Sequence, residues 1–357
     1  MKKRIGILTS GGDCPGLNAA IRGVAKASYG MFDCEIIGIK DGFKGLIHNN
    51  YQVMTPKDFA GLLVRGGTIF GTSRTPYKKM RKIEIDGIDK VKNMKENYAK
   101  MELDCLITLG GNGTHKNANL LREEGLNVIA LPKTIDNDIW GTDVTFGFHS
   151  AVDIATEVID RIHTTADSHD RVMLVELMGH KAGWLTLYAG IAGGADVILI
   201  PEIPYSTDKV LDSLDKRHSS GKNFSILAVS EGAVTTKESK MKKKEFKKER
   251  AKMKHSSVSY RLAHEINEEL GLETRVTIPG HQQRGGTPSP YDRILATKLG
   301  AYAAELIANR DYGKTISIVN KKLWATPLEE VAGKLKLVDK DNILISTGRL
   351  INTSFGD

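Results

Sequence analysis

Short apolar runs alternate along this chain with longer stretches in which apolar positions recur at helical spacing. The runs predict strands at residues 4–9, 35–39, 104–109, 127–131, 172–178, 197–201, 225–230, 274–278 and 315–319. Helical spacing lies between most of them, for example at residues 16–29, 115–124, 150–163, 258–270 and 291–309. This alternation is typical of α/β proteins in which helices cover both faces of a parallel sheet.

The length and the glycine positions add two expectations. A chain of 357 residues is longer than most single domains, so we expect two. Several of its 36 glycines stand in pairs just after predicted strands, as in Gly11-Gly12, Gly110-Gly111 and Gly193-Gly194. Ligands of open α/β sheets bind at the carboxyl ends of strands. The glycines therefore indicate a ligand site at that edge.

Basic residues exceed acidic ones, and the excess is concentrated in one place. The formal net charge is +8, and residues 237–254, called the Lys-rich segment below, hold nine Lys and one Arg against three Glu. The remainder is close to neutral, whereas a protein that wraps nucleic acid spreads basic residues over its body. We expect this segment to be a solvated helix or a mobile loop. Contact with nucleic acid or an acidic partner is the alternative.

Simple features exclude other classes of protein. No apolar run approaches the ~18 residues of a membrane span, and the apolar stretch near the N-terminus is too short for a signal peptide. The cysteines, Cys14, Cys34 and Cys105, lack C-x-x-C spacing. Their number and spacing argue against a disulfide framework or a zinc site. We expect a cytoplasmic protein with no membrane or nucleic-acid partner.

Two glycine-rich turns, at residues 9–16 and 109–115, each link a predicted strand to a predicted helix. Backbone N–H groups in such turns, and the helix N-terminus behind them, suit a phosphate. Neither turn has the spacing of a P-loop, and a tight turn without a ligand is the alternative for each. Two of them in one chain favour a polyphosphate ligand.

Two further loops carry side chains suited to a phosphorylated substrate. Residues 132–138, Pro-Lys-Thr-Ile-Asp-Asn-Asp, place two carboxylates two positions apart. One can act as a base and the other as a metal ligand or orienting group, although Asp and Asn are also common turn formers. Residues 280–288 combine an imidazole, a guanidinium and glycines. Arg171 and Arg275 open predicted strands and suit bidentate phosphate binding, although arginines there can simply be solvated.

Together these segments resemble the 6-phosphofructokinase family of glycolysis. The matching stretches, in family order, are residues 8–13, 18–23, 71–74, 132–138, 178–179, 280–284 and 290–293. The resemblance implies two Rossmann-like three-layer α/β domains with mostly parallel sheets and an active site in the cleft between them. The implied phosphoryl-donor domain is residues 1–147 plus 283–333, and the sugar-phosphate domain is residues 148–282 plus 334–357.

The implied reaction is transfer of a phosphoryl group from ATP, with Mg²⁺, to the 1-hydroxyl of fructose 6-phosphate. Asp136 would be the base, Asp138 would orient that group near Mg²⁺, and Thr134 and Arg171 would assist catalysis. The donor would bind Gly12, Arg74, Thr75, Gly111, Asn112, Gly113 and Thr114. The sugar phosphate would bind Thr134, Ile135, Asp136, Met178, Gly179, His180, Glu231, His281, Gln282, Gln283 and Arg284. Because the family's counterparts of Arg171 and Arg275 reach the 6-phosphate from a neighbouring subunit, the resemblance implies a homotetramer or a dimer.

Four positions bear on the donor, the metal and the sugar. Pyrophosphate-using relatives carry an Asp where this chain has Gly113; that carboxylate would repel the α-phosphate of a nucleotide, so Gly113 favours ATP. Lys133 resembles the residue that pyrophosphate users place beside the base, so a pyrophosphate-dependent enzyme is the alternative. Asn112 replaces the family's usual acidic residue and is a weaker candidate Mg²⁺ ligand than a carboxylate. His180 stands where an arginine normally follows Met-Gly.

The resemblance extends poorly to regulation. Basic residues that match the family's effector site are present at Arg22, Lys26 and Lys222. The three other effector positions depart from the pattern, and we expect weak or no response to ADP and phosphoenolpyruvate; these positions are His163, Asp196 and Phe224.

Two readings of other kinds stay open. One is a catalytically weak anion or nucleic-acid binding protein on this scaffold, against which Asp136 and Asp138 argue. The other is an NAD or lipid kinase with a similar glycine turn, against which residues 281–284 argue.

Overall fold

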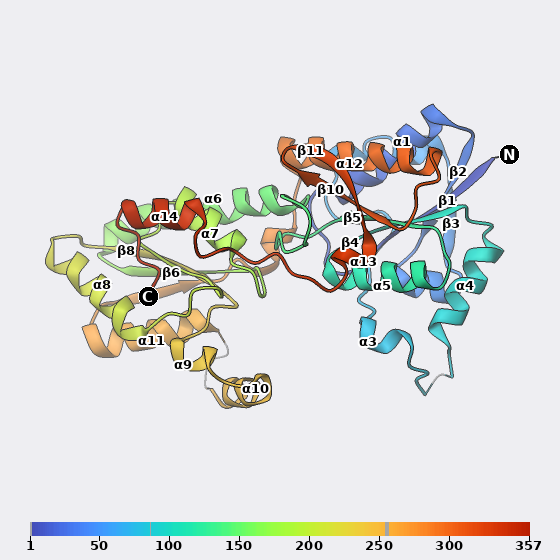
Figure 1. The fold of residues 1–357 in the computed structure, drawn as a ribbon. Coiled ribbons are helices and arrows are strands. Elements are labelled where there is room, and N and C mark those ends of the chain that lie inside the picture. Colours follow the sequence, from blue (N-terminus) through green and yellow to red (C-terminus); the bar gives the residue numbers. More distant parts are fainter. Residues whose placement is uncertain (1, 86, 254–256) are drawn as a thin grey trace. The chain divides into compact units, whose positions relative to one another are not determined.

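The computed structural model describes residues 2–85, 87–253 and 257–357. The chain folds into two compact units (Figure 1). Unit 1 comprises Met1–Ser150 and Arg284–Lys336, and unit 2 comprises Ala151–Gln283 and Leu337–Asp357. The resemblance placed the corresponding crossings near residues 147, 282 and 333. The functional labels attached to the two domains stay predictions.

Unit 1 is built on a seven-stranded sheet of order β11-β10-β5-β4-β1-β2-β3. The five inner strands are parallel, and the edge strands β3 and β11 run antiparallel to their neighbours. The strands are β1 (Lys3–Thr9), β2 (Cys34–Ile39), β3 (Tyr51–Met54), β4 (Cys105–Gly110), β5 (Val128–Pro132), β10 (Lys314–Val319) and β11 (Lys322–Pro327).

Helices cover both faces of this sheet (Figure 1). On one face α1 (Leu17–Met31) packs against α12 (Pro290–Ala308), and on the other lie α4 (Lys90–Lys100) and α5 (Asn112–Glu123). Buried apolar residues such as Leu8, Leu106 and Met94 form a core. Shorter helices complete the unit, namely α2 (Phe43–His48), η1 (Pro56–Phe59), η2 (Leu62–Val64), α3 (Tyr77–Met80) and α13 (Leu328–Val331).

Unit 2 contains a four-stranded parallel sheet of order β7-β8-β6-β9. Its strands are β6 (Val172–Leu177), β7 (Val197–Leu199), β8 (Ser225–Ser230) and β9 (Thr274–Thr277). In Figure 1 the sheet lies between two groups of helices. One group is α6 (Phe148–His169), α7 (Trp184–Ala192) and α14 (Ile343–Leu350), and the other includes α8 (Thr207–Ser219) and α11 (Val258–Leu270). The short helix η3 (Gly280–Arg284) follows β9.

The predicted fold class is confirmed. All nine predicted strands form, with ends within two residues of the expected ones, and the five predicted helices form as well. The pattern missed β3 and β11, the two antiparallel edge strands. Three of the four β3 residues are exposed, so this strand lacks the apolar run by which buried parallel strands are detected. Among the described residues, no helix is long and apolar enough to span a membrane.

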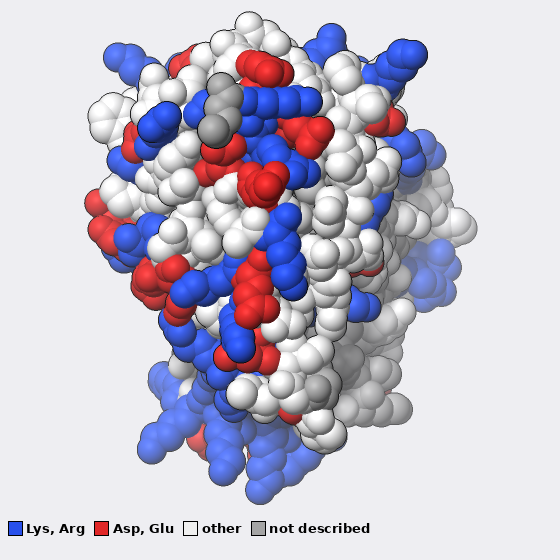
Figure 2. Space-filling model, turned by 90° about the vertical axis from the view of Figure 1, so that its right-hand side faces the viewer, with Lys and Arg blue, Asp and Glu red and all other residues white. Residues whose placement is uncertain are grey.

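The Lys-rich segment is helical over most of its length. It contributes α9 (Thr236–Ser239) and α10 (Lys243–Lys252), and α10 has no buried residue. The expectation of a solvated helix is thereby confirmed for α10, whereas Glu238 of α9 is buried. Lys254 lies outside the described part of the chain. Elsewhere charges of both signs mix. Figure 2 shows acidic and basic side chains interspersed on the face it presents, with Lys and Arg gathered at its lower end.

Candidate functional site

Three loops of unit 1 start at one edge of its sheet because three adjacent parallel strands end there. Thr9 of β1 pairs with Leu109 of β4, and Gly110 pairs with Pro132 of β5. The two glycine turns and the aspartate loop, residues 133–138, therefore leave the sheet side by side. This confirms that Gly11-Gly12 and Gly110-Gly111 mark the carboxyl ends of strands, where α/β sheets bind ligands. The expectation was wrong for Gly193-Gly194, which ends helix α7 and precedes β7.

The first glycine turn lies against two cations. A Cβ atom on Gly12 would come within 2.8 Å of Nη1 of Arg284, so any other residue here would require the guanidinium to shift. Arg284 Nη1 donates to the carbonyl oxygen of Asp13 at 3.1 Å, and Lys133 Nζ donates to that of Gly12. Lys133 is only 3% exposed, and burial lowers the pKa of its ammonium. Two cations on one partly buried turn suit an anionic ligand.

The second glycine turn opens α5. Gly111 is its N-cap residue, and Asn112 Nδ2 donates to the carbonyl oxygen of Lys334. The Thr114 side chain is buried and its hydroxyl donates to Ser10 O at 3.4 Å, so the two turns are tied to each other. At Gly113 a Cβ would meet no atom within 4 Å. The start of α5 thus has free space at Gly113, the position that the resemblance linked to the choice of phosphoryl donor.

A further loop, residues 71–75, is hydrogen-bonded to the first glycine turn. The backbone N–H of Gly11 donates to Ser73 O at 3.1 Å, and Thr72 Oγ1 donates to Gly11 O at 2.7 Å. Arg74 is exposed, and together with Thr75 it lines a cavity of about 240 Å³. Other cations line the same cavity, namely Lys44 and Lys90. The predicted donor residues Gly12, Arg74 and Thr75 thus belong to connected loops.

The aspartate loop is held by hydrogen bonds from its own unit. The backbone N–H of Asp136 donates to Thr134 Oγ1 at 3.1 Å. Asn137, at a left-handed φ of 50°, accepts from Thr145 N and from Lys336 Nζ, both at 3.0 Å. Lys336 Nζ also donates to Thr142 O and Asp143 O. Asn137 Oδ1 is thus fixed between two donors, which leaves the carboxylates on either side of it in a defined loop.

Besides Lys133, one carboxylate of this loop and the ammonium of Lys336 beside it have shifted pKa values. Burial and the neighbouring charge of Asp136 raise the pKa of Asp138 to about 6. Burial lowers the pKa of Lys336 to about 8, although Asp143 and Asp138 oppose the shift. Two carboxylates that interact in this way favour a cation beside them. Carboxylate oxygens are also the ligands that Mg²⁺ prefers, usually with substrate phosphates. The residues present therefore fit a magnesium ion, although no group of three or more metal-binding side chains occurs among residues 2–85, 87–253 and 257–357.

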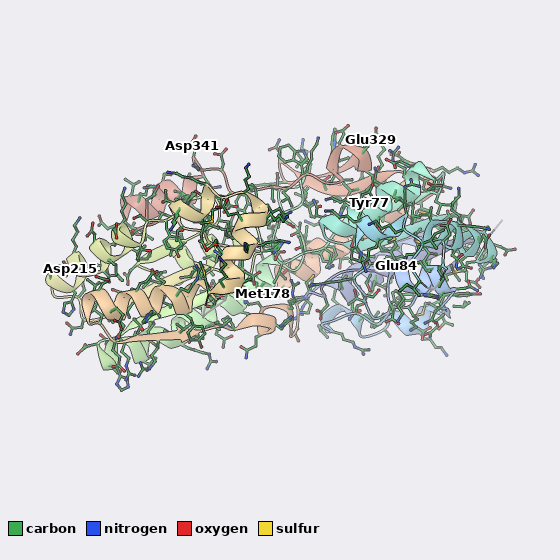
Figure 3. The ribbon with its side chains drawn as sticks, turned by 90° about the horizontal axis from the view of Figure 1, so that it is seen from below. Tyr77, Glu84, Met178, Asp215, Glu329 and Asp341 are labelled. Atoms are coloured by element: carbon green, nitrogen blue, oxygen red, sulfur yellow. The ribbon has the colours of Figure 1, made fainter. Side chains whose placement is uncertain are left out.

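In unit 2 the loops after β6 and β8 carry the predicted sugar residues. His180 N donates to Glu231 Oε1 at 3.0 Å, and a Cβ on Gly232 would lie 1.9 Å from His180 O. Met178, labelled in Figure 3, follows β6, and its backbone N–H donates to Gln283 Oε1 at 3.3 Å. Both His180 and Glu231 are exposed, whereas Gln283 is fully buried. His281 and Gln282, in η3, are exposed as well.

The two predicted phosphate-binding arginines of unit 2 share one carboxylate. Arg171 Nε lies 2.9 Å from Glu273 Oε2, and Arg275 pairs with the other oxygen of Glu273. The guanidinium of Arg171 holds the pKa of Glu273 below its usual range, with a further contribution from Arg275. Two arginines on one exposed carboxylate are positioned where a phosphate dianion could replace it.

Sequence reasoning missed several residues of these sites. Lys336 and Glu273 belong to no sequence motif. Lys336 contacts Asn137, which is distant in the sequence, and Glu273 pairs with Arg171 beside the neighbouring strand. Asn137 lies inside a predicted loop, but only its left-handed backbone shows its role. No local pattern signals such partners, because they depend on tertiary contacts.

Comparisons with known proteins agree on one family. A family model described as phosphofructokinase matches residues 4–307. The chain is 59% identical to the ATP-dependent 6-phosphofructokinase of Spirochaeta thermophila, over 99% of this chain and 98% of that protein. It is 48% identical to the ATP-dependent 6-phosphofructokinase 3 of Bacteroides thetaiotaomicron, over 99% of this chain and all of that protein.

Solved structures are similar as well. Phosphofructokinase from Saccharomyces cerevisiae matches with a TM-score of 0.79 and 32% identity, over 92% of this chain. The match spans only 45% of that longer chain. A pyrophosphate-dependent phosphofructokinase from Marinobacter aquaeolei matches with a TM-score of 0.80, over 96% of this chain and 88% of that one. At 20% identity, this second likeness shows the fold alone.

Proposed function

We propose that this chain, which belongs to the phosphofructokinase family, transfers the terminal phosphoryl group of ATP to the 1-hydroxyl of fructose 6-phosphate. Full-length relatives with 44–59% identity are named ATP-dependent 6-phosphofructokinases, and the chain is accordingly a phosphotransferase. The observation that carries the choice of donor is the space at Gly113, beside the first turn of α5. A carboxylate there would repel the α-phosphate of a nucleotide.

Unit 1 supplies the groups proposed to bind the donor. The turns at Gly12 and Gly111 present backbone N–H groups and a helix N-terminus to the phosphates. Arg284 and Lys133 lie against the first turn and add positive charge. Phosphoryl transfer depends mostly on positioning and charge neutralisation, which these groups provide.

The aspartate loop supplies the proposed base and metal ligand. Asp136 takes the proton from the sugar 1-hydroxyl as it attacks, a role that contributes roughly 10²–10⁴ in rate. Asp138 and the weaker ligand Asn112 would hold Mg²⁺, which supplies neutralisation of the donor's phosphate charge. Lys336 acts as a positioning residue, because it fixes Asn137 between the two aspartates.

Unit 2 supplies the groups proposed to bind fructose 6-phosphate. Glu231 and the backbone at Met178 and Gly179 contact the sugar, and His281 contacts its phosphate together with Arg284 of unit 1. Arg171 and Arg275 bind the 6-phosphate of a neighbouring subunit, so the active form is an oligomer, a homotetramer or a dimer. We also propose that the enzyme works in the cytoplasm and responds weakly or not at all to ADP and phosphoenolpyruvate.

The second candidate is a pyrophosphate-dependent enzyme, which the buried Lys133 beside the first turn favours. Steady-state assays with fructose 6-phosphate and either donor, each over a range of Mg²⁺, separate the two. We expect turnover with ATP and little with pyrophosphate. Turnover with pyrophosphate and none with ATP would reverse the assignment, and no turnover with either would support the binding-protein alternative.

A further inference from the structure

Unit 2 contains a cavity of about 670 Å³ that the sequence did not indicate. One side carries His180, Lys181 and Glu231, from the loops proposed to bind the sugar phosphate. The other side carries residues of α10, the main helix of the Lys-rich segment. The segment therefore lies next to substrate-binding loops instead of projecting away from them.

One face of α10 lines this cavity. Lys243, Phe246, Lys247 and Arg250 lie at the i, i+3, i+4 and i+7 positions of a helix, and all four are among the lining residues. Lys244 and Lys248, each one position further along, are not among them. The helix thus directs two of its lysines towards the cavity and leaves two matched lysines outside it.

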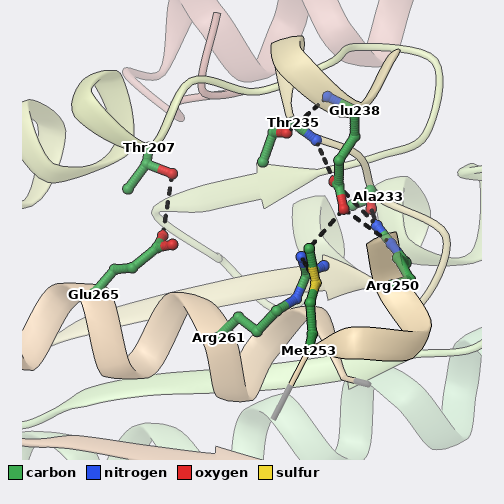
Figure 4. Close-up of polar contacts among 8 residues, drawn as sticks. All are labelled: Thr207, Ala233, Thr235, Glu238, Arg250, Met253, Arg261 and Glu265. Atoms are coloured by element: carbon green, nitrogen blue, oxygen red, sulfur yellow. Dashed lines mark hydrogen bonds and ion pairs between the residues drawn. The ribbon is translucent and has the colours of Figure 1, made fainter. Parts of the chain in front are cut away.

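The helix is held in this orientation by a nearly buried carboxylate (Figure 4). Glu238 accepts from Arg250 Nε at 3.0 Å and from Arg261 Nη1 at 3.1 Å, and its side chain is 5% exposed. Burial alone would raise the pKa of Glu238, but Arg250, the N–H of Thr235 and Arg261 together lower it, so the carboxylate stays charged. A buried ion pair of this kind fixes geometry because breaking it leaves an uncompensated charge.

Arg250 also ties the helix to the loop that carries Glu231. Its Nη2 donates to the carbonyl oxygen of Ala233 at 2.7 Å, two residues beyond Glu231 (Figure 4). Its guanidinium lies over the ring of Phe246, 4.7 Å from the centroid. The face of α10 that carries Lys243 and Lys247 is thereby held in a fixed position beside the sugar-phosphate loops.

The charges around the cavity suit a phosphorylated ligand. Lys181, Lys243 and Lys247 bring three cations to it, against the carboxylate of Glu231 and the paired Glu238. His180 stands where relatives carry an arginine, so the loop after β6 lacks a guanidinium at this position and has the ammonium of Lys181 beside it instead. We propose that Lys243 and Lys247 replace that missing charge and contact the phosphorylated sugar. This inference rests on the proposed function, because it assigns a ligand of the same site.

The test compares two double variants. Lys243→Ala with Lys247→Ala removes the cavity lysines, and Lys244→Ala with Lys248→Ala removes the same charge from the same helix. We expect the first to raise the KM for fructose 6-phosphate about tenfold, as expected for two exposed cations lost from one dianion, with kcat and the KM for ATP within about twofold. The control should behave as wild type. Equal KM values in the two double variants would overturn the proposal.

A third variant makes the test specific to the missing arginine. Adding His180→Arg to Lys243→Ala with Lys247→Ala should restore most of the lost affinity, because it returns a cation to the loop after β6. A merely structural role of α10 predicts no such rescue. Both double variants should also melt as cooperatively as wild type in circular dichroism; a cavity-facing variant that loses its folded transition would show that the lysines act through stability, against the proposal.

Direct binding separates this inference from the proposed function. Calorimetric titration with inorganic phosphate measures the affinity of the cavity for phosphate without turnover. The cavity-facing variant should bind phosphate several-fold more weakly than the control. An enzyme without phosphofructokinase activity that still shows this difference would refute the proposed reaction but keep the cation site. Loss of binding to a single-stranded oligonucleotide in both double variants alike, with phosphate binding unchanged, would instead indicate a nucleic-acid surface and overturn the proposal.

Discussion

The aspartate loop of unit 1 and the sugar-phosphate loops of unit 2 differ in how far their polar and charged groups are exposed to solvent. Asn137 is 3% exposed and sits between fixed donors, and burial shifts the pKa values of both Asp138 and Lys336. His180, Glu231 and Arg275 are exposed instead. Buried charges cannot reorient without a large cost, whereas exposed ones are screened and adaptable. We infer that unit 1 sets the rate of the chemical step and unit 2 mainly sets affinity for the sugar phosphate.

The largest effect should come from Asp136→Asn. The amide cannot accept the hydroxyl proton, so kcat should fall roughly 10³-fold, within the range of a lost general base. The value of kcat is measured with an assay in which aldolase cleaves the product, fructose 1,6-bisphosphate. As a control, Asp143→Asn removes a carboxylate a few residues further along and should change kcat by less than about threefold. Equal losses in the two variants would indicate a charge effect on folding instead of catalysis.

Asp138→Asn should lower activity and raise stability at the same time. The carboxyl keeps its proton up to pH about 6 in the folded protein but ionises near 3.8 in the unfolded chain. Its ionisation therefore costs folding free energy as pH rises from about 4 to 6, and this loss persists above pH 6. At pH 7.5 the amide should raise the unfolding free energy by ~2–3 kcal/mol, while kcat falls roughly 10²-fold because the Mg²⁺ ligand is lost.

Urea unfolding at two pH values checks the sign. Near pH 4 the gain of Asp138→Asn should disappear, because the folded wild type is then protonated at this position. A gain that is equal at pH 4 and 7.5 would show that ionisation is not its cause.

A smaller effect is expected at the donor turn. Gly113→Asp adds a side chain where a Cβ meets no atom within 4 Å, so the fold should tolerate it. The added carboxylate should raise the KM for ATP roughly tenfold through repulsion of the α-phosphate. Gly113→Asn has the same shape without the charge and should raise that KM by less than about threefold. Equal KM values for the two variants would mean that size, not charge, selects the donor.

The smallest effect should appear in unit 2 at Glu273→Gln. The substitution removes the carboxylate that occupies Arg171 and Arg275, so a phosphate no longer competes with it. The KM for fructose 6-phosphate should fall about two- to threefold at low salt, as is typical of exposed pairs. Kinetics at 20 and 300 mM KCl measure this difference. A rise in KM would show that Glu273 orients the arginines for the ligand instead of competing with it.

Much of this architecture was predictable from the sequence, and the exceptions share a cause. Buried parallel strands such as β4 read as apolar runs, and the glycine turns were recognisable as the pairs Gly11-Gly12 and Gly110-Gly111 after such runs. The edge strand β3 is mostly exposed, so its sequence contains no run of apolar residues that would predict a strand. Lys336, Glu273 and the cavity face of α10 act on groups brought near by folding, so no local spacing reveals them.

Calorimetric titration of Asp136→Asn with fructose 6-phosphate tests most directly whether unit 1 sets the rate of the chemical step and unit 2 sets the affinity for the sugar phosphate. We expect a Kd within about threefold of the wild-type value, despite the roughly 10³-fold loss of kcat. A Kd weakened by as much as kcat falls would contradict it, because Asp136 would then bind the sugar rather than take its proton.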